Sequence, residues 1–191
     1  GAAFSHLISY VTDVRMNNDW LIYLLPLGGV AIAFIYHILK VEHQGTNQVF
    51  EAVRSEKRVP FSLAPAITLG AGITHLLGGS AGKEGAALQL GGSIATVIGE
   101  IFRVDDKDRH ILTVSGMAAV FAAVFGTPIG AAVFAVEVVS VGYVSLSALY
   151  PSFASALTAY IVAVKLGVHP ERFQVGIIPE ISAVSILKVM A

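Results

Sequence analysis

Apolar and polar residues follow one another along this chain in long blocks. Long apolar stretches alternate with short polar or glycine-rich segments, and at the start of the chain Phe4, Leu7, Ile8 and Val11 recur at helical spacing. The pattern predicts an all-α chain. We expect helices over residues 1–14, 20–41, 46–54, 61–77, 86–102, 112–125, 129–139 and 143–166.

Residues 20–41 are the clearest candidate for a membrane-spanning helix. This segment follows a polar turn at residues 13–19 and is about as long as the roughly 20 residues that a bilayer core requires. Trp20 and Lys40 are placed for the two membrane interfaces, and Pro26 is expected to bend the helix. Residues 143–166 are expected to form the last full span.

The composition is that of an integral membrane protein. The 191 residues are 55% hydrophobic and only 13% charged, whereas a soluble domain carries about 25% charged residues. The mean hydropathy is +0.75. A net charge of −1 excludes the basic surface of a nucleic-acid binder. The chain has no cysteine and its six histidines lack metal-ligand spacing, so no metal and no cofactor are expected.

A glycine-rich turn at residues 78–85 precedes the apolar segment 86–102. Unpaired backbone N–H groups and the helix dipole make such a helix start attractive to anions. It is no nucleotide-binding loop, because Leu77 replaces the first glycine and Glu84 follows Lys83 where Ser or Thr is required. Glu84 lies between two segments apolar enough for a membrane, which favours a functional carboxylate; a helix cap at an aqueous surface is the simpler alternative.

Two further segments contain candidate chemistry. Gly45, Thr46 and Asn47 open a short polar helix that is consistent with a re-entrant element, although a capped surface helix explains the pattern too. Small residues over 112–125 favour close helix packing, and the break at residues 126–128 starts a new helix that carries Glu137. We expect Glu137 to be a packed, hydrogen-bonded structural carboxylate rather than a proton carrier.

The residues Gly82-Lys83-Glu84-Gly85, then Gln89 and Gly91-Gly92, resemble the Gly-(Arg/Lys)-Glu-Gly-Pro motif of the CLC family of chloride channels and proton-coupled antiporters. Ala86 stands where that family has proline. Residues 126–137 are also similar to the family. The match at residues 45–48 is weak, since only Gly45 agrees with Gly-Ser-Gly-Ile-Pro and Thr46 replaces its serine hydroxyl.

The resemblance implies a polytopic fold of which residues 1–191 form one membrane domain, the first of two inverted repeats. It implies transport of a halide anion, chloride or fluoride among the candidates, with Glu84 as the gate and protons as a possible second partner. The implied anion-binding residues are Gly45, Thr46, Asn47, Gly82, Lys83, Gly85 and Ala86. Val138 falls where proton-coupled members carry their second acid.

The resemblance also implies a homodimer, with residues 129–139 and 143–166 at the interface, in the cytoplasmic (plasma) membrane. Both ends of the chain resemble cuts, so the 191 residues alone are not expected to conduct. Cations at residues 40–60 predict that this region faces the cytoplasm, and the charged segment 103–109 is expected to be a solvated loop. The alternatives are a membrane enzyme that pairs Glu84 with Glu137, and a non-transporting assembly subunit.

Overall fold

The computed structural model describes residues 1–41, 45–54, 58–139 and 146–168, and within these ranges every regular element is helical. The elements in chain order are α1 (Ala2–Met16), the 3-10 helix η1 (Asp19–Leu24), α2 (Leu25–Ile38), α3 (Thr46–Arg54), α4 (Leu63–Leu76), α5 (Lys83–Ile101), α6 (Asp106–Phe125), α7 (Pro128–Val139) and α8 (Leu146–Lys165). The all-α prediction is therefore confirmed. The first three residues of the helix expected over 143–166 lie outside the described residues.

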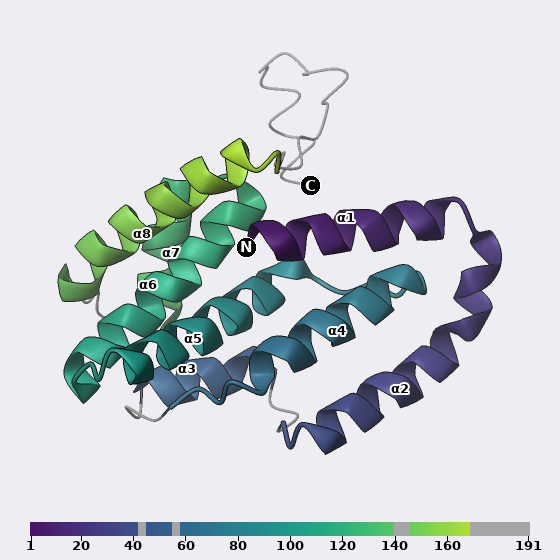
Figure 1. Ribbon diagram of the computed structural model, residues 1–191, viewed down its shortest axis with the longest axis horizontal. Helices are drawn as coiled ribbons and strands as arrows, with labels where there is room; N and C mark the ends of the chain where they lie inside the picture. Colours follow the sequence, from purple (N-terminus) through teal and green to yellow (C-terminus); the bar gives the residue numbers. More distant parts are fainter. Residues whose placement is uncertain (42–44, 55–57, 140–145, 169–191) are drawn as a thin grey trace, which may run out of the picture.

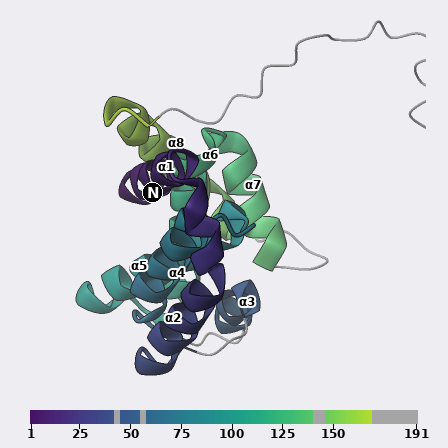
Figure 2. The ribbon, with the colours of Figure 1, turned by 90° about the vertical axis from the view of Figure 1, so that its right-hand side faces the viewer.

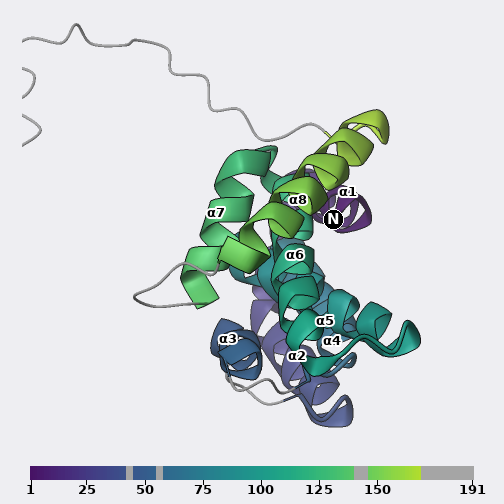
Figure 3. The same cartoon turned by 90° about the vertical axis from the view of Figure 1, so that its left-hand side faces the viewer.

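Helix α6 is the centre of the arrangement, because it packs extensively against α5, α7 and α8 (Figure 1). Helix α4 lies against α5, and α1 and α2 lie against α4. Figures 2 and 3 show α3 and α7 on one flank of the molecule and the end of α5 on the other. The most exposed of these helices is α2, whose Leu27, Val30 and Phe34 are 66%, 69% and 62% exposed.

Small residues allow the close contact between α5 and α6. A Cβ atom on Gly91 would collide with the backbone of Gly116, and one on Gly116 would lie 2.7 Å from the carbonyl oxygen of Gly91. The backbones of the two helices therefore touch at this pair. In a bilayer, where lipid is as apolar as the side chains, such close van der Waals contact is a principal source of helix association. Thr96 and Thr113 extend the contact, with 3.4 Å between their hydroxyl oxygens.

Three helices are long and apolar enough to cross a membrane within the described ranges, namely Asp19–Ile38, Asp108–Phe125 and Leu146–Lys165. Helices α4 and α7 are apolar but shorter. The segment 86–102 is expected to be apolar enough for a membrane, but α5 is not among the candidate spans. The expected span at residues 20–41 is the six-residue 3-10 helix η1 followed by α2, with Pro26 in the first turn of α2 where its missing N–H costs nothing.

The predicted boundaries of α1 and α6 are wrong. Helix α1 continues to Met16, through part of the expected polar turn. Helix α6 starts at Asp106 instead of Leu112, so most of the expected charged loop is the first turn of a helix. Asp105 has the extended backbone of an N-cap, and acidic residues are favoured at a helix start, which explains why this charged segment folds. The break at Gly126 is confirmed, with a left-handed φ of 70°.

Candidate functional site

The site begins with Gly82, which is the N-cap of α5. Its backbone is extended, with φ −73° and ψ 144°, and Lys83 is the first helical residue. The helix thus starts three residues before the expected Ala86. Alanine lacks the ring that fixes proline at a first helical position, so nothing holds the start at residue 86. The amides that have no carbonyl partner inside α5 belong to Gly82, Lys83, Glu84 and Gly85.

The Glu84 side chain folds back over this helix start. One of its carboxylate oxygens, Oε2, is so close to Gly82 that a Cβ atom there would collide with it. A carboxylate in this position interacts favourably with the positive end of the helix dipole. Glu84 is exposed at the surface of the described chain, while Ala86 through Ser93 are buried. The carboxylate therefore covers the helix start from the outside.

The start of α3 meets the start of α5. The Thr46 hydroxyl oxygen lies 2.7 Å from the position that a Cβ atom on Gly85 would occupy, and Val49 lies 2.9 Å from the equivalent position on Gly92. Gly45, just before α3, has a left-handed φ of 58°. The structure therefore brings together Gly45 and Thr46 with Gly82, Glu84 and Gly85. Asn47, the third residue predicted at this start, is exposed.

The buried side chain of Gln89 supports the contact between the starts of α3 and α5. Its side chain is 5% exposed, and its Nε2 donates a hydrogen bond of 3.1 Å to the carbonyl oxygen of Gly85. The same Nε2 lies 3.8 Å from the position of a Cβ on Gly85. A buried amide with this partner fixes the backbone of the first turn on the side that faces Thr46.

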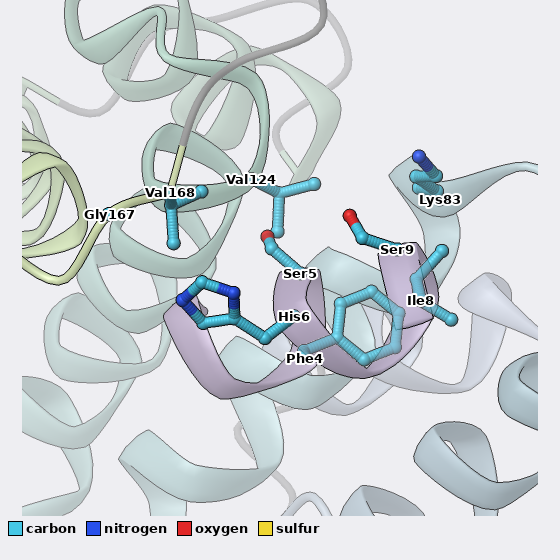
Figure 4. Close-up of a pocket in the computed structure, with 9 residues that line it drawn as sticks. All are labelled: Phe4, Ser5, His6, Ile8, Ser9, Lys83, Val124, Gly167 and Val168. Carbon is cyan, nitrogen blue, oxygen red and sulfur yellow. The ribbon is translucent and has the colours of Figure 1, made fainter. Parts of the chain in front are cut away.

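Lys83 turns to a different side of the helix start. It is half-buried and lines a cavity of about 240 Å³, together with Phe4, Ser5, His6, Ile8, Ser9, Val124, Gly167 and Val168. Figure 4 shows the α1 side chains on one side of this cavity and Val124 and Val168 on the other. The Ser5 hydroxyl is buried without a hydrogen-bond partner, and His6 Nε2 lies 3.1 Å from the carbonyl oxygen of Leu166.

Sequence reasoning missed this cavity. Ser5 and Ser9 are four residues apart and so share one face of α1, but a pair of serines in an apolar helix is no specific signal. His6 was one of six scattered histidines. Only the packing of α1 beside the start of α5 and the end of α6 places these groups near Lys83.

Glu137 does not join this site. It lies near the end of α7, which packs on α6, α8 and α3 but makes no extensive contact with α5 within the described ranges. Glu137 is exposed on the described chain, and its role as a packed structural carboxylate stays a prediction. Two carboxylates on helices that are not packed together form no acid–base pair, so this arrangement gives the enzyme alternative no support.

Known proteins resemble this chain along its whole length. The family model described as voltage gated chloride channel matches residues 28–191. A chloride/fluoride channel protein of Pseudomonas syringae pv. tomato is 33% identical over 192 residues, which cover 100% of this chain and 42% of that protein. An H(+)/Cl(-) exchange transporter of Vibrio vulnificus is 29% identical over 161 residues, covering 72% of this chain and 33% of the relative.

A solved structure is similar as well. The crystal structure of a CLC-type fluoride/proton antiporter matches with a TM-score of 0.86 and 34% sequence identity, covering 99% of this chain and 48% of that chain. This chain therefore spans less than half the length of each of these relatives.

Proposed function

This chain belongs to the voltage-gated chloride channel family, and on that premise we propose that its protein carries small halide anions across a membrane through a pathway gated by Glu84. One observation carries the proposal. The starts of α3 and α5 meet at Thr46 and Gly85, and the Glu84 carboxylate lies over the α5 start. Two helix starts and one competing carboxylate are the minimum needed for a gated anion site.

The anion site would be built from backbone groups. The amides of Gly82 to Gly85 lack partners inside α5, and the aligned peptide dipoles place about half a positive charge at this end. The Thr46 hydroxyl adds a donor from α3. These groups replace the water molecules that an anion loses when it enters the membrane, and their neutrality lets the anion leave again.

Glu84 would act as the gate through competition. While ionised, its carboxylate occupies the positive end of α5 and excludes the anion. When protonated, it loses its charge and its advantage at the dipole, so an anion displaces it. This couples anion movement to protons on one side of the pathway. Val138 stands beside Glu137 where a second acid would continue a proton path, so we propose Glu84 as the titrating group of the described site.

Fluoride is the anion we favour among the halides. Two matches that cover all or nearly all of this chain carry fluoride in their names, a chloride/fluoride channel protein and a fluoride/proton antiporter. The relative named for chloride exchange covers 72% of the chain. A small anion holds its water strongly, and only hydrogen-bond donors in direct contact, such as the Thr46 hydroxyl and the amides at Gly85, can replace that water.

The wider organisation is part of the proposal. We propose that residues 1–191 are one membrane domain and the first of two repeats, which agrees with coverage of less than half of each relative. We also propose a homodimer in the cytoplasmic membrane, because α7 and α8 leave apolar side chains exposed: Ile129, Val133, Phe134, Leu157, Ile161 and Val162. Cross-linking in mild detergent that yields only monomer would contradict the dimer.

Anion efflux from liposomes that contain the full-length protein tests the proposal. Fluoride and chloride efflux are recorded with an anion-selective electrode across a series of pH values, with and without a proton gradient. We expect Glu84→Gln, which is neutral and nearly isosteric, to keep anion efflux and to lose its pH dependence and any proton coupling. Glu137→Gln is the matched control and should keep the wild-type profile. An unchanged profile in Glu84→Gln would end the gate hypothesis.

A further inference from the structure

Three arginines surround one hollow at the turn between α5 and α6. This hollow, about 360 Å³ in volume, is lined by Arg58, Glu100, Arg103, Val104 and Arg109. Arg58 forms an exposed ion pair with Glu100 at 3.3 Å, and Arg109 donates a hydrogen bond of 3.1 Å to the carbonyl oxygen of Val104. The lining carries three guanidinium groups and one carboxylate, so the charge of the lining residues themselves is positive.

Arg103 occupies a backbone conformation that normally belongs to glycine. Its φ is 54°, and it ends α5 in a turn where its own N–H bonds to the carbonyl of Glu100 and the N–H of Val104 bonds to that of Gly99. The equivalent position after α4 is Gly78, and after α8 it is Gly167. Arginine is strained in this conformation relative to glycine, so an Arg103→Gly change relieves strain while it removes the positive charge.

The residues just before Arg103 are apolar and exposed. Ile101 and Phe102 are 71% and 75% exposed, although they end an otherwise well-packed helix. Arginine donors line the hollow, and two large exposed apolar residues directly precede Arg103 in the chain. A soluble anion would need only the arginines, whereas a lipid presents a phosphate with acyl chains beside it.

The hollow also lies at the right level for a membrane surface. The candidate span Asp108–Phe125 begins beside it, and the candidate span Asp19–Ile38 ends just before Lys40. Figure 1 shows α3, the end of α2 and the α5–α6 turn along the lower edge of the molecule, away from the chain ends. Lys40, Arg54 and Arg103 belong to these segments. Arg58 lies between α3 and α4 and Arg109 in the first turn of α6, and such a group of cations favours the cytoplasmic side.

We propose that this hollow binds the phosphate of an anionic phospholipid in the cytoplasmic leaflet, held by Arg58, Arg103 and Arg109 with Ile101 and Phe102 against the acyl chains. Planar guanidinium groups suit phosphate oxygens because they form paired, charge-assisted hydrogen bonds. Asp105 and Asp108 lie at the start of α6 but do not line the hollow. The site goes beyond the proposed transport function and does not depend on it.

Native mass spectrometry of the full-length protein in mild detergent tests the proposal, with titration of phosphatidylglycerol or phosphatidylcholine. We expect retention of phosphatidylglycerol over phosphatidylcholine. Arg58→Gln and Arg103→Gly should each weaken phosphatidylglycerol binding about fivefold, which is the weight of one arginine near a charged lipid surface. Because Arg58 is exposed, its loss should leave the melting temperature almost unchanged.

Lys40→Gly is the matched control. Lys40 ends α2 with φ 51° in the same kind of turn, yet it does not line the hollow. Both glycine variants should melt at or above the wild-type temperature in lipid-free detergent, but only Arg103→Gly should lose lipid. Three outcomes would overturn the proposal. Lys40→Gly could lose as much lipid as Arg103→Gly, Arg103→Gly could melt below the wild-type temperature, or the Arg58→Gln/Arg103→Gly double variant could retain lipid as the wild type does. Thermal stabilisation by inorganic phosphate equal to that by phosphatidylglycerol would replace the lipid with a soluble anion and overturn it too.

Discussion

The two helix starts that meet at Gly85 are built in opposite ways. The start of α5 has a glycine N-cap and carries its own anion, the Glu84 carboxylate, which lies over Gly82 and is exposed. The start of α3 carries no acid in its first turn and presents the half-buried Thr46, whose hydroxyl lies against Gly85. The start of α5 thus has a carboxylate that competes with an incoming anion, whereas the start of α3 has only a hydrogen-bond donor.

This difference assigns separate tasks to the two starts. A carboxylate responds to pH and can withdraw, whereas a hydroxyl that is packed between helices keeps its place and its neutrality. Under the proposed function we expect variants at Glu84 and Gly82 to change the pH at which the anion site opens. Variants at Thr46 and Gly85 should change how tightly the site holds an anion and whether the two helices fit together.

The largest effect is expected for Gly85→Ala. The new Cβ atom would lie 2.7 Å from the Thr46 hydroxyl oxygen, so α3 or the Thr46 side chain must move. We expect a loss of about 1–3 kcal/mol in the free energy of unfolding, as for other overpacked sites, together with reduced anion efflux. Thermal unfolding of the purified protein and liposome efflux measure the two consequences.

Two variants control this result. Gly29→Ala makes the same change on α2, where a Cβ atom would meet nothing within 4 Å, and should be neutral or slightly stabilising. Thr46→Ala in the Gly85→Ala background removes the colliding oxygen and leaves the Thr46 Cβ at 4.0 Å, so it should restore stability but not full anion binding. If stability stayed low in the double variant, the Thr46–Gly85 contact would not be the cause.

A smaller effect is expected for Gly82→Ala. Its Cβ atom would collide with Glu84 Oε2, which pushes the carboxylate away from the helix start without disturbing α3. We expect anion efflux at a pH where the wild-type protein is closed, and a loss of stability of about 1 kcal/mol or less because alanine is a poorer N-cap than glycine. A pH profile identical to that of the wild type would show that the Glu84 position over Gly82 is unrelated to gating.

The smallest effect on the stability of the fold is expected for Thr46→Val, which removes one hydroxyl and preserves the shape of the side chain. Its effect is on binding: loss of one hydrogen bond to a bound anion corresponds to about 1.5–3 kcal/mol when the partner is charged, or a roughly ten- to hundredfold weaker anion affinity. Isothermal titration of the detergent-purified protein with fluoride and chloride measures it. Thr46→Ser should bind anions as the wild type does. If Thr46→Val bound fluoride and chloride with the wild-type affinities, Thr46 would be excluded as an anion ligand.

Much of the fold was predictable because it depends on local signals. The expected helix at residues 46–54 is the observed α3, and the helix expected from the break at Gly126 begins at Pro128. Glycine supplies the left-handed end of α6 and proline suits the first turn of α7, and both effects operate within a few residues. The start of α5 was misplaced because local propensity allows several starts among small residues, and Gly82 became the cap.

The sequence by itself determined that this is an all-helical membrane protein with a glycine-rich, acidic helix start at Glu84. Composition, helical period and turn residues are properties of short segments, so they can be read without a structure. Only the tertiary structure decided that Thr46 meets Gly85, that Lys83 faces α1, and that Arg58 joins Arg103 and Arg109 in one hollow. These groups are distant in the chain, and their contacts depend on how closely small residues such as Gly91 and Gly116 let the helices approach.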